Sequence, residues 1–174
     1  MIIKATIMLD DGTQNVSFSV SSSQLAAWAA TLSDTENHSV VFDILSKHDD
    51  SSVREAIAGM SRLPDAGIRR LAVDPALFVV KDLLRAQEIR ARLTADEVLA
   101  ICRRDPELAA SVAGTYEDYV LDDDAVIDFL ENHPDCQVRA NLADNPFVPK
   151  AVLRRMAASD PDAEIRESAR VVML

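Results

Sequence analysis

Residues 133–169 read HPDCQVRANLADNPFVPKAVLRRMAASDPDAEIRESA, and this stretch contains one motif twice. The motif is Pro-Asp-x-x-Val/Ile-Arg, and its copies begin at Pro134 and Pro161, 27 residues apart. A motif that recurs at this spacing within one chain is typical of proteins built from stacked repeats. The whole chain is therefore best read in units of this period.

Three further turns fit the period, at Asp49, Pro75 and Pro106, so that neighbouring turns are 26 to 31 residues apart. Four residues after each turn comes an apolar or small side chain: Val53, Val79, Ala110, Val138 and Ile165. Each turn follows an apolar pair at helical spacing: Val41/Ile44, Ile68/Leu71, Val98/Ile101, Val126/Phe129 and Leu153/Met156. Proline disfavours helix in the residue before it and fits the first turn of a new helix. Each unit is therefore predicted to be a helix, an Asp-Pro turn and a second helix.

The N-terminal residues show a different pattern. Residues 2–9 and 16–20 favour strands, and Asp11-Gly12 lies between them, which predicts a β-hairpin. Ser21 to Ser23 supply a helix cap before an alanine-rich helix over 24–32. The predicted fold is mainly α: a superhelical α/α solenoid of about five helix pairs over 37–174. A hairpin and a capping helix over 1–36 precede it.

The stretch 141–166 resembles the leucine-rich repeat variant, a bacterial α/α repeat similar in architecture to HEAT and armadillo arrays. The family pattern is close to N-P-x-x-P-x-x-x-L-x-x-L-A-x-D-P-D-x-x-V-R. Asn145-Pro146, Pro149, Leu153, Asp160-Pro161-Asp162 and Ile165-Arg166 match it. The match is good over 125–170, recognisable over 41–85 and weak over 94–121. The resemblance implies a right-handed superhelix and no single activity. One member carries an iron–sulfur cluster on a group of cysteines that this chain lacks, so no cofactor is expected.

Composition narrows the functional classes. The net charge is −11, which argues against general binding to nucleic acid, because phosphate binders rely on Lys and Arg. The two cysteines, Cys102 and Cys136, form no C-x-x-C motif or disulfide framework. No signal peptide or membrane span is recognisable, so a cytoplasmic protein is expected. Cys102 occupies a position that is apolar in other units and is predicted to be buried.

Charge is unevenly distributed along the chain. Between Asp105 and Val138 there are ten acidic residues and no Lys or Arg, whereas 62–104 contains nine basic and six acidic residues. Such an acidic surface would attract a protein partner with a basic surface; the alternative is a solvated face that only keeps the protein soluble. The candidate partner-binding residues are two tyrosines and five acids: Tyr116, Tyr119, Glu117, Asp118, Asp122, Asp123 and Asp124. Asp122 to Asp124 do not have the spacing of a calcium loop and are predicted to form a first helical turn.

Arginine recurs at one position of the repeat, at Arg54, Arg139 and Arg166. These arginines could form a ladder for a carboxylate-bearing partner, but the favoured interpretation is that each bridges to an Asp of the neighbouring turn. No catalytic motif is recognisable, so a non-catalytic protein-binding module is expected, of an adaptor or inhibitor and immunity type. The alternatives are a HEAT-like DNA-processing enzyme of the glycosylase type and a DNA-mimicking inhibitor. The exposed hairpin edge is a candidate site for homodimerisation.

Overall fold

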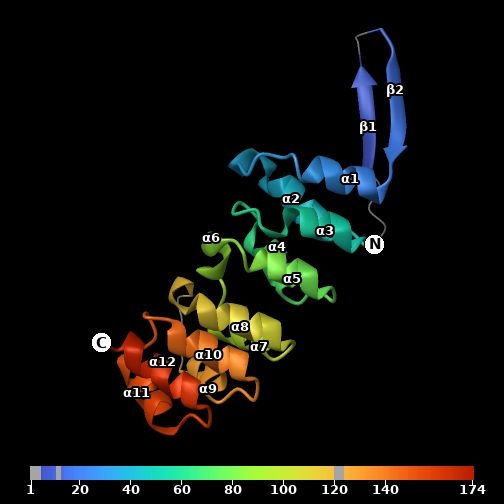
Figure 1. The fold of residues 1–174 in the computed structure, drawn as a ribbon. Helices are drawn as coiled ribbons and strands as arrows, with labels where there is room; N and C mark the ends of the chain where they lie inside the picture. The colour runs from blue at the N-terminus through green and yellow to red at the C-terminus, as the bar shows by residue number, and fades with distance from the viewer. Residues whose placement is uncertain (1–4, 11–12, 120–123) are drawn as a thin grey trace. The chain divides into compact units, whose positions relative to one another are not determined.

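The computed structural model describes residues 5–10, 13–119 and 124–174. The chain is mainly helical and carries a two-stranded antiparallel hairpin at its N-terminal side, as predicted (Figure 1). It divides into two compact units, residues 1–89 and 90–174. The superhelical arrangement of the entire array stays a prediction.

The first unit contains the hairpin followed by short helices. Its elements are β1 (Ala5–Asp10), β2 (Asn15–Val20), α1 (Ser22–Ala29), α2 (Ser39–Leu45), α3 (Ser51–Ala58), α4 (Asp65–Ala72) and α5 (Leu77–Leu83). A 3₁₀ turn, Glu36–His38, precedes α2, and a single-turn helix, α6 (Gln87–Arg90), lies at the boundary of the two units. Within the first unit α3 packs against both α1 and α5, which makes it the central helix.

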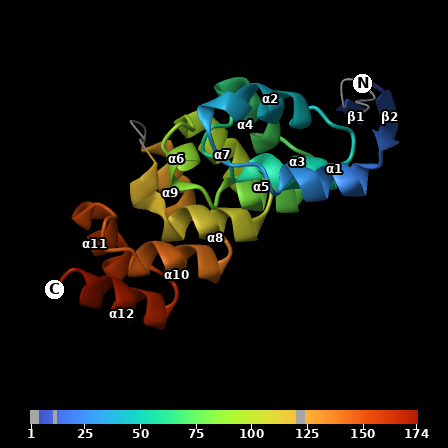
Figure 2. The ribbon, with the colours of Figure 1, turned by 90° about the horizontal axis from the view of Figure 1, so that it is seen from above.

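The second unit consists of helix pairs. Its elements are α7 (Ala95–Cys102), α8 (Pro106–Gly114), a 3₁₀ turn (Tyr116–Asp118), α9 (Ala125–Glu131), α10 (Cys136–Asp144), α11 (Lys150–Ser159) and α12 (Ala163–Val172). Helix α10 packs between α8 and α12, so the second helices of successive pairs form one layer (Figure 2). Val138, Leu142 and Ala143 of α10 are fully buried in this layer.

The hairpin pairs Ile7 with Phe18 and Leu9 with Val16. Val16 and Phe18 remain 55% and 48% exposed. Near α1, a small cleft of about 230 Å³ separates the hairpin from Trp28. The predicted Asp11-Gly12 turn lies outside the described residues, and homodimerisation through the hairpin edge stays a prediction. Ser21 caps α1 as expected, through a capping box with Gln24.

The turns of the repeats share a hydrogen bond. A side-chain acceptor at the start of each turn accepts from the backbone N–H two residues on, at 2.9 to 3.1 Å. The acceptor is an aspartate in three turns and a histidine in two: Asp74, Asp105, Asp160, His48 and His133. The ring nitrogen that accepts is Nδ1, so these imidazoles carry their proton on Nε2. Histidine therefore replaces aspartate in this turn without loss of the bond.

The core of the first repeat is displaced by one residue from its predicted register, whereas Ile68 and Leu71 before the second turn are fully buried as predicted. The buried pair before the first turn is Phe42 and Leu45, whereas Ile44 is 47% exposed. The prediction of Val41 and Ile44 is wrong here because the buried pair lies seven and four residues before Asp49, one residue nearer to its turn than the buried pairs that lie eight and five residues before Pro106 and Pro161. In the second unit Val98, Ile101, Val126, Leu153 and Met156 are buried as predicted, whereas Phe129 is half-buried and its neighbour Leu130 is fully buried instead.

A carboxylate outside the repeats connects two loops of the first unit. Asp34 accepts from the backbone N–H groups of Ser61 and Arg62, at 2.7 and 2.9 Å. Burial alone would raise the pKa of Asp34, but the hydrogen bonds from Arg62 and Ser61 outweigh it and lower the pKa below its ordinary value. The ionised form of Asp34 therefore stabilises the folded state.

We expect Asp34→Asn to lower the free energy of unfolding by about 0.5 kcal/mol at pH 7, since the group is largely solvent-screened. The folded pKa is the lower one, so this contribution is present above the unfolded pKa of about 3.9 and is lost as the pH falls through the folded value. Urea unfolding at pH 7 and in acid measures this contribution: the difference in the free energy of unfolding between Asp34→Asn and the parent protein should shrink in acid. An equal difference at both pH values would contradict this assignment, and Glu88→Gln, at an exposed position, is the matched control.

Candidate functional site

The recurrent arginines join successive turns of the repeat. Arg54 bonds both oxygens of Asp74, with Nε–Oδ2 and Nη2–Oδ1 distances of 2.5 and 2.9 Å. Arg139 bonds Asp160 in the same way, at 2.9 and 3.4 Å. The Asp74 and Asp160 side chains are only 3% and 2% exposed. The predicted bridge to the neighbouring turn is confirmed for Arg54 and Arg139, and both arginines stabilise the stacking of the helix pairs.

Each of these arginines also holds the turn that precedes its own helix. Nη1 of Arg54 donates to the carbonyls of His48 and Asp49, and Nη1 of Arg139 donates to those of His133 and Pro134. Five N–H donors in a rigid plane suit this double role, which a lysine could not perform. The ladder positions are therefore structural in these two helices.

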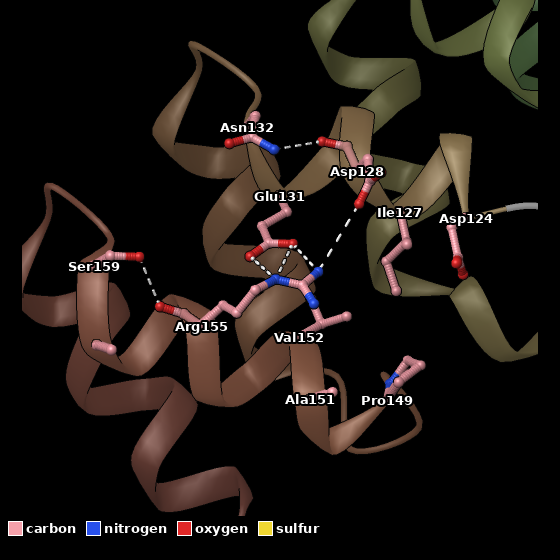
Figure 3. Close-up of a pocket in the computed structure, with 11 residues that line it drawn as sticks. Asp124, Ile127, Asp128, Glu131, Asn132, Pro149, Ala151, Val152, Arg155 and Ser159 are labelled. Atoms are coloured by element: carbon pink, nitrogen blue, oxygen red, sulfur yellow. Dashed lines mark hydrogen bonds and ion pairs between the residues drawn. The ribbon is translucent and has the colours of Figure 1, made fainter.

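A groove between α9 and α11 is the candidate functional site of the second unit (Figure 3). Its volume is about 740 Å³. Acidic side chains line it from α9, one arginine lines it from α11, and apolar side chains form its floor: Asp124, Asp128, Glu131, Arg155, Ile127, Pro149 and Val152. The groove therefore presents carboxylates beside a modest apolar surface.

One ion pair closes part of this groove. Arg155 binds Glu131 through both carboxylate oxygens, with Nε distances of 3.0 and 3.2 Å and an Nη2 distance of 2.5 Å. Asp128 lies 3.9 Å from the same guanidinium and is 64% exposed (Figure 3). The bond to Glu131 raises the pKa of Arg155 above its ordinary value and outweighs the opposite effect of burial. Arg155 therefore neutralises Glu131 and leaves Asp128 facing solvent.

Two of the predicted partner-binding residues, Asp118 and Glu117, have hydrogen-bond partners within the fold, and a third, Tyr119, is buried. Asp118 accepts from Arg90 at 2.6 and 3.0 Å, and both side chains are 11% exposed. Tyr119 is 6% exposed, and burial raises the pKa of its hydroxyl well above the ordinary value. Glu117 is exposed and accepts from the side-chain amide of Asn145 at 2.8 Å.

Tyr116 is half-buried and experiences the charge of Asp124. Burial, and then the negative charge of Asp124, raises the pKa of the Tyr116 hydroxyl. Asp124 is exposed and precedes α9; its backbone carbonyl accepts from the N–H of Asp128, but its side chain makes no capping hydrogen bond. Asp122 and Asp123 lie outside the described residues. Of the five predicted positions that the structure describes, Asp124 alone lines the groove.

The prediction did not include Asp128, Glu131 and Arg155. Asp128 is four residues from Asp124, a spacing that places two side chains on the same face of a helix, so the sequence did contain a signal for this pair. The link from Glu131 to Arg155 spans 24 residues and had no such signal.

The chemistry of the groove is that of a cation-binding surface. Carboxylates accept hydrogen bonds from ammonium and guanidinium groups. Among the described residues no three His, Cys, Asp or Glu side chains are grouped so as to hold a metal ion. Cys102 is buried as predicted, and burial raises its pKa to about 12. Cys136 is exposed.

No helix among the described residues has the length and apolar character needed to cross a membrane. The comparisons with known proteins give no relatives: no protein family, no curated protein and no solved structure matches this chain.

Proposed function

We propose that this chain is a non-catalytic protein-binding module, an adaptor or an inhibitor of the immunity type, whose groove between α9 and α11 takes a basic segment of a partner protein. The observation that carries the proposal is the arrangement of Asp124 and Asp128. Both are exposed on one edge of the groove, and the arginine nearest to them makes its short bonds to Glu131 instead.

The charge of the second unit supports this proposal. Residues 90–174 contain 17 acidic and 10 basic residues, so the unit attracts cationic surfaces at long range. The apolar floor supplied by Ile127 and Val152 can cover the aliphatic stems of Lys or Arg while their charged ends reach the carboxylates. Charge complementarity of this kind raises association rates and selects the partner.

The test is affinity capture with the purified protein as bait, followed by measurement of binding to each partner recovered. We expect Asp124→Asn combined with Asp128→Asn to weaken binding by about tenfold, since two carboxylates each contribute roughly 0.5–1 kcal/mol. Binding should also weaken between about 50 and 500 mM salt, because surface charges are screened. The charge-matched control is Glu88→Gln with Glu164→Gln, two exposed acids outside the groove.

Two results would overturn the proposal: no protein partner at low salt, or equal loss of binding in the groove variant and its control. Duplex DNA serves as a competitor in the same assay. Displacement of the partner by DNA would favour the DNA-mimicking inhibitor. Direct DNA binding by the chain at physiological salt would favour the DNA-processing enzyme.

A further inference from the structure

Arg166 of α12 repeats one half of the arrangement made by Arg54 and Arg139. Its Nη1 donates to the carbonyls of Asp160 and Pro161, at 2.6 and 3.2 Å. Arg139, at the same position one repeat earlier, makes the equivalent bonds to the carbonyls of its own turn. The guanidinium of Arg166 is therefore held in the orientation that the other two copies use.

The second half of the arrangement is open. In Arg54 and Arg139, Nε and Nη2 donate to the two oxygens of one aspartate. Within the described residues, Nε and Nη2 of Arg166 have no acceptor. Arg166 is half-buried, whereas Arg139 is 8% exposed beneath the turn that carries Asp160. A fixed pair of donors at carboxylate spacing thus faces outward from α12.

The face around Arg166 differs from its counterpart on α10. Helix α12 packs against α10 and α11 and lies on the far side of α10 from α8 (Figure 2). One turn after Arg139, α10 has the fully buried Ala143; the position one repeat later on α12 is Arg170, 54% exposed at its side chain. Arg170 bonds Glu167 and the carbonyl of Ala157. A large charged residue here prevents the close helix packing that Ala143 allows.

We propose that this face of α12 binds an acidic turn of a partner protein, with one carboxylate in the fork formed by Nε and Nη2 of Arg166. A turn is favoured over a packed helix because Arg170 replaces alanine. An acidic segment is favoured because two guanidinium groups lie one helical turn apart on a chain that is otherwise strongly acidic. This inference does not depend on the groove between α9 and α11, and it adds a second surface of opposite preference.

The test is a nuclear magnetic resonance titration of the arginine Nε–Hε signals of the full chain. The probe is an acetylated and amidated peptide that copies residues 159–164, Ser-Asp-Pro-Asp-Ala-Glu, the turn whose aspartate binds Arg139. We expect a saturable shift of the Arg166 signal. A peptide with Asp160→Asn should bind about tenfold more weakly, because a charge-assisted pair is lost.

Variants of the protein distinguish two-point binding by the Arg166 guanidinium from attraction by positive charge alone. Arg166→Lys, followed through the backbone amide signals of α12 because the Arg166 Nε–Hε signal is lost, should abolish the saturable binding, since lysine keeps the charge but cannot form the fork. Arg154→Lys, at an exposed arginine of α11, should leave it unchanged. The inference is overturned if the Arg166 signal stays in place at about 20 mM peptide, a concentration at which even weak pairing is detected. Equal shifts with the Asp160→Asn peptide would also overturn it, and this comparison needs no protein variant.

Discussion

Arg139→Ala is expected to lower the free energy of unfolding by about 3 kcal/mol, because it leaves the Asp160 carboxylate buried and unpaired. The Asp160 side chain is 2% exposed, and the Arg139 guanidinium supplies two of its hydrogen bonds. The same change removes the donor to the carbonyls of His133 and Pro134. Urea unfolding followed by circular dichroism measures the loss.

Two controls distinguish the buried ion pair from a general effect of losing an arginine. Arg155→Ala removes a side chain that is 51% exposed, so its cost should stay below about 1 kcal/mol. Adding Asp160→Asn to Arg139→Ala should recover part of the stability, because the amide oxygen still accepts from Asp162 while the buried charge is gone. A double variant that is less stable than Arg139→Ala would contradict this account.

Phe42→Ala is expected to cost about 3–5 kcal/mol in the first unit, the usual range for a fully buried phenylalanine. Phe42 is 0% exposed on α2, and His38 contacts its ring edge-on with a centroid distance of 6.2 Å. Trp28, the only tryptophan, lies in this unit, so its fluorescence reports the unfolding of the first unit. Phe147→Ala, at a side chain that is 67% exposed, should change stability by about 0.5 kcal/mol or less.

The Phe42 variant also tests the register of the first repeat. Val41 and Ile44 were the predicted core positions, and Ile44 is 47% exposed. Ile44→Ala should therefore be far less costly than Phe42→Ala. The reverse order would favour the sequence-based register over that of the structure.

The sequence predicted the local fold well because each signal acts over a few residues. Proline after Asp or His ends one helix and begins the next, and Asp-Gly between two strand-forming runs marks the hairpin. The register of Phe42 could not be predicted, since a shift of one residue in a degenerate repeat changes which face of a short helix is apolar. Local patterns therefore predict elements more reliably than they predict which side chains are buried.

The candidate site was less predictable for a different reason. The acidic residues between Asp105 and Val138 lie in one stretch of the sequence, but the arginines that pair with two of them are distant in sequence. Arg90 binds Asp118, and Arg155 binds Glu131. Asp135 caps α10. A run of like charges does not reveal which of its members are neutralised by the fold. The structure leaves Asp124 and Asp128 exposed at the groove.

The hydrogen bond that begins each turn limits how the repeats can be exchanged. Both histidine and aspartate can accept the hydrogen bond that begins the turn. Only aspartate can also accept hydrogen bonds from an arginine of the preceding helix pair. Ser111 stands at the arginine position before the His133 turn, whereas Arg139 stands before the Asp160 turn. A rearranged chain that placed an Arg-bearing pair before a His turn would bring two donors against an imidazole Nε2–H. Shuffled or duplicated arrays are therefore expected to be less stable wherever an arginine at this position packs against a histidine turn instead of an aspartate turn.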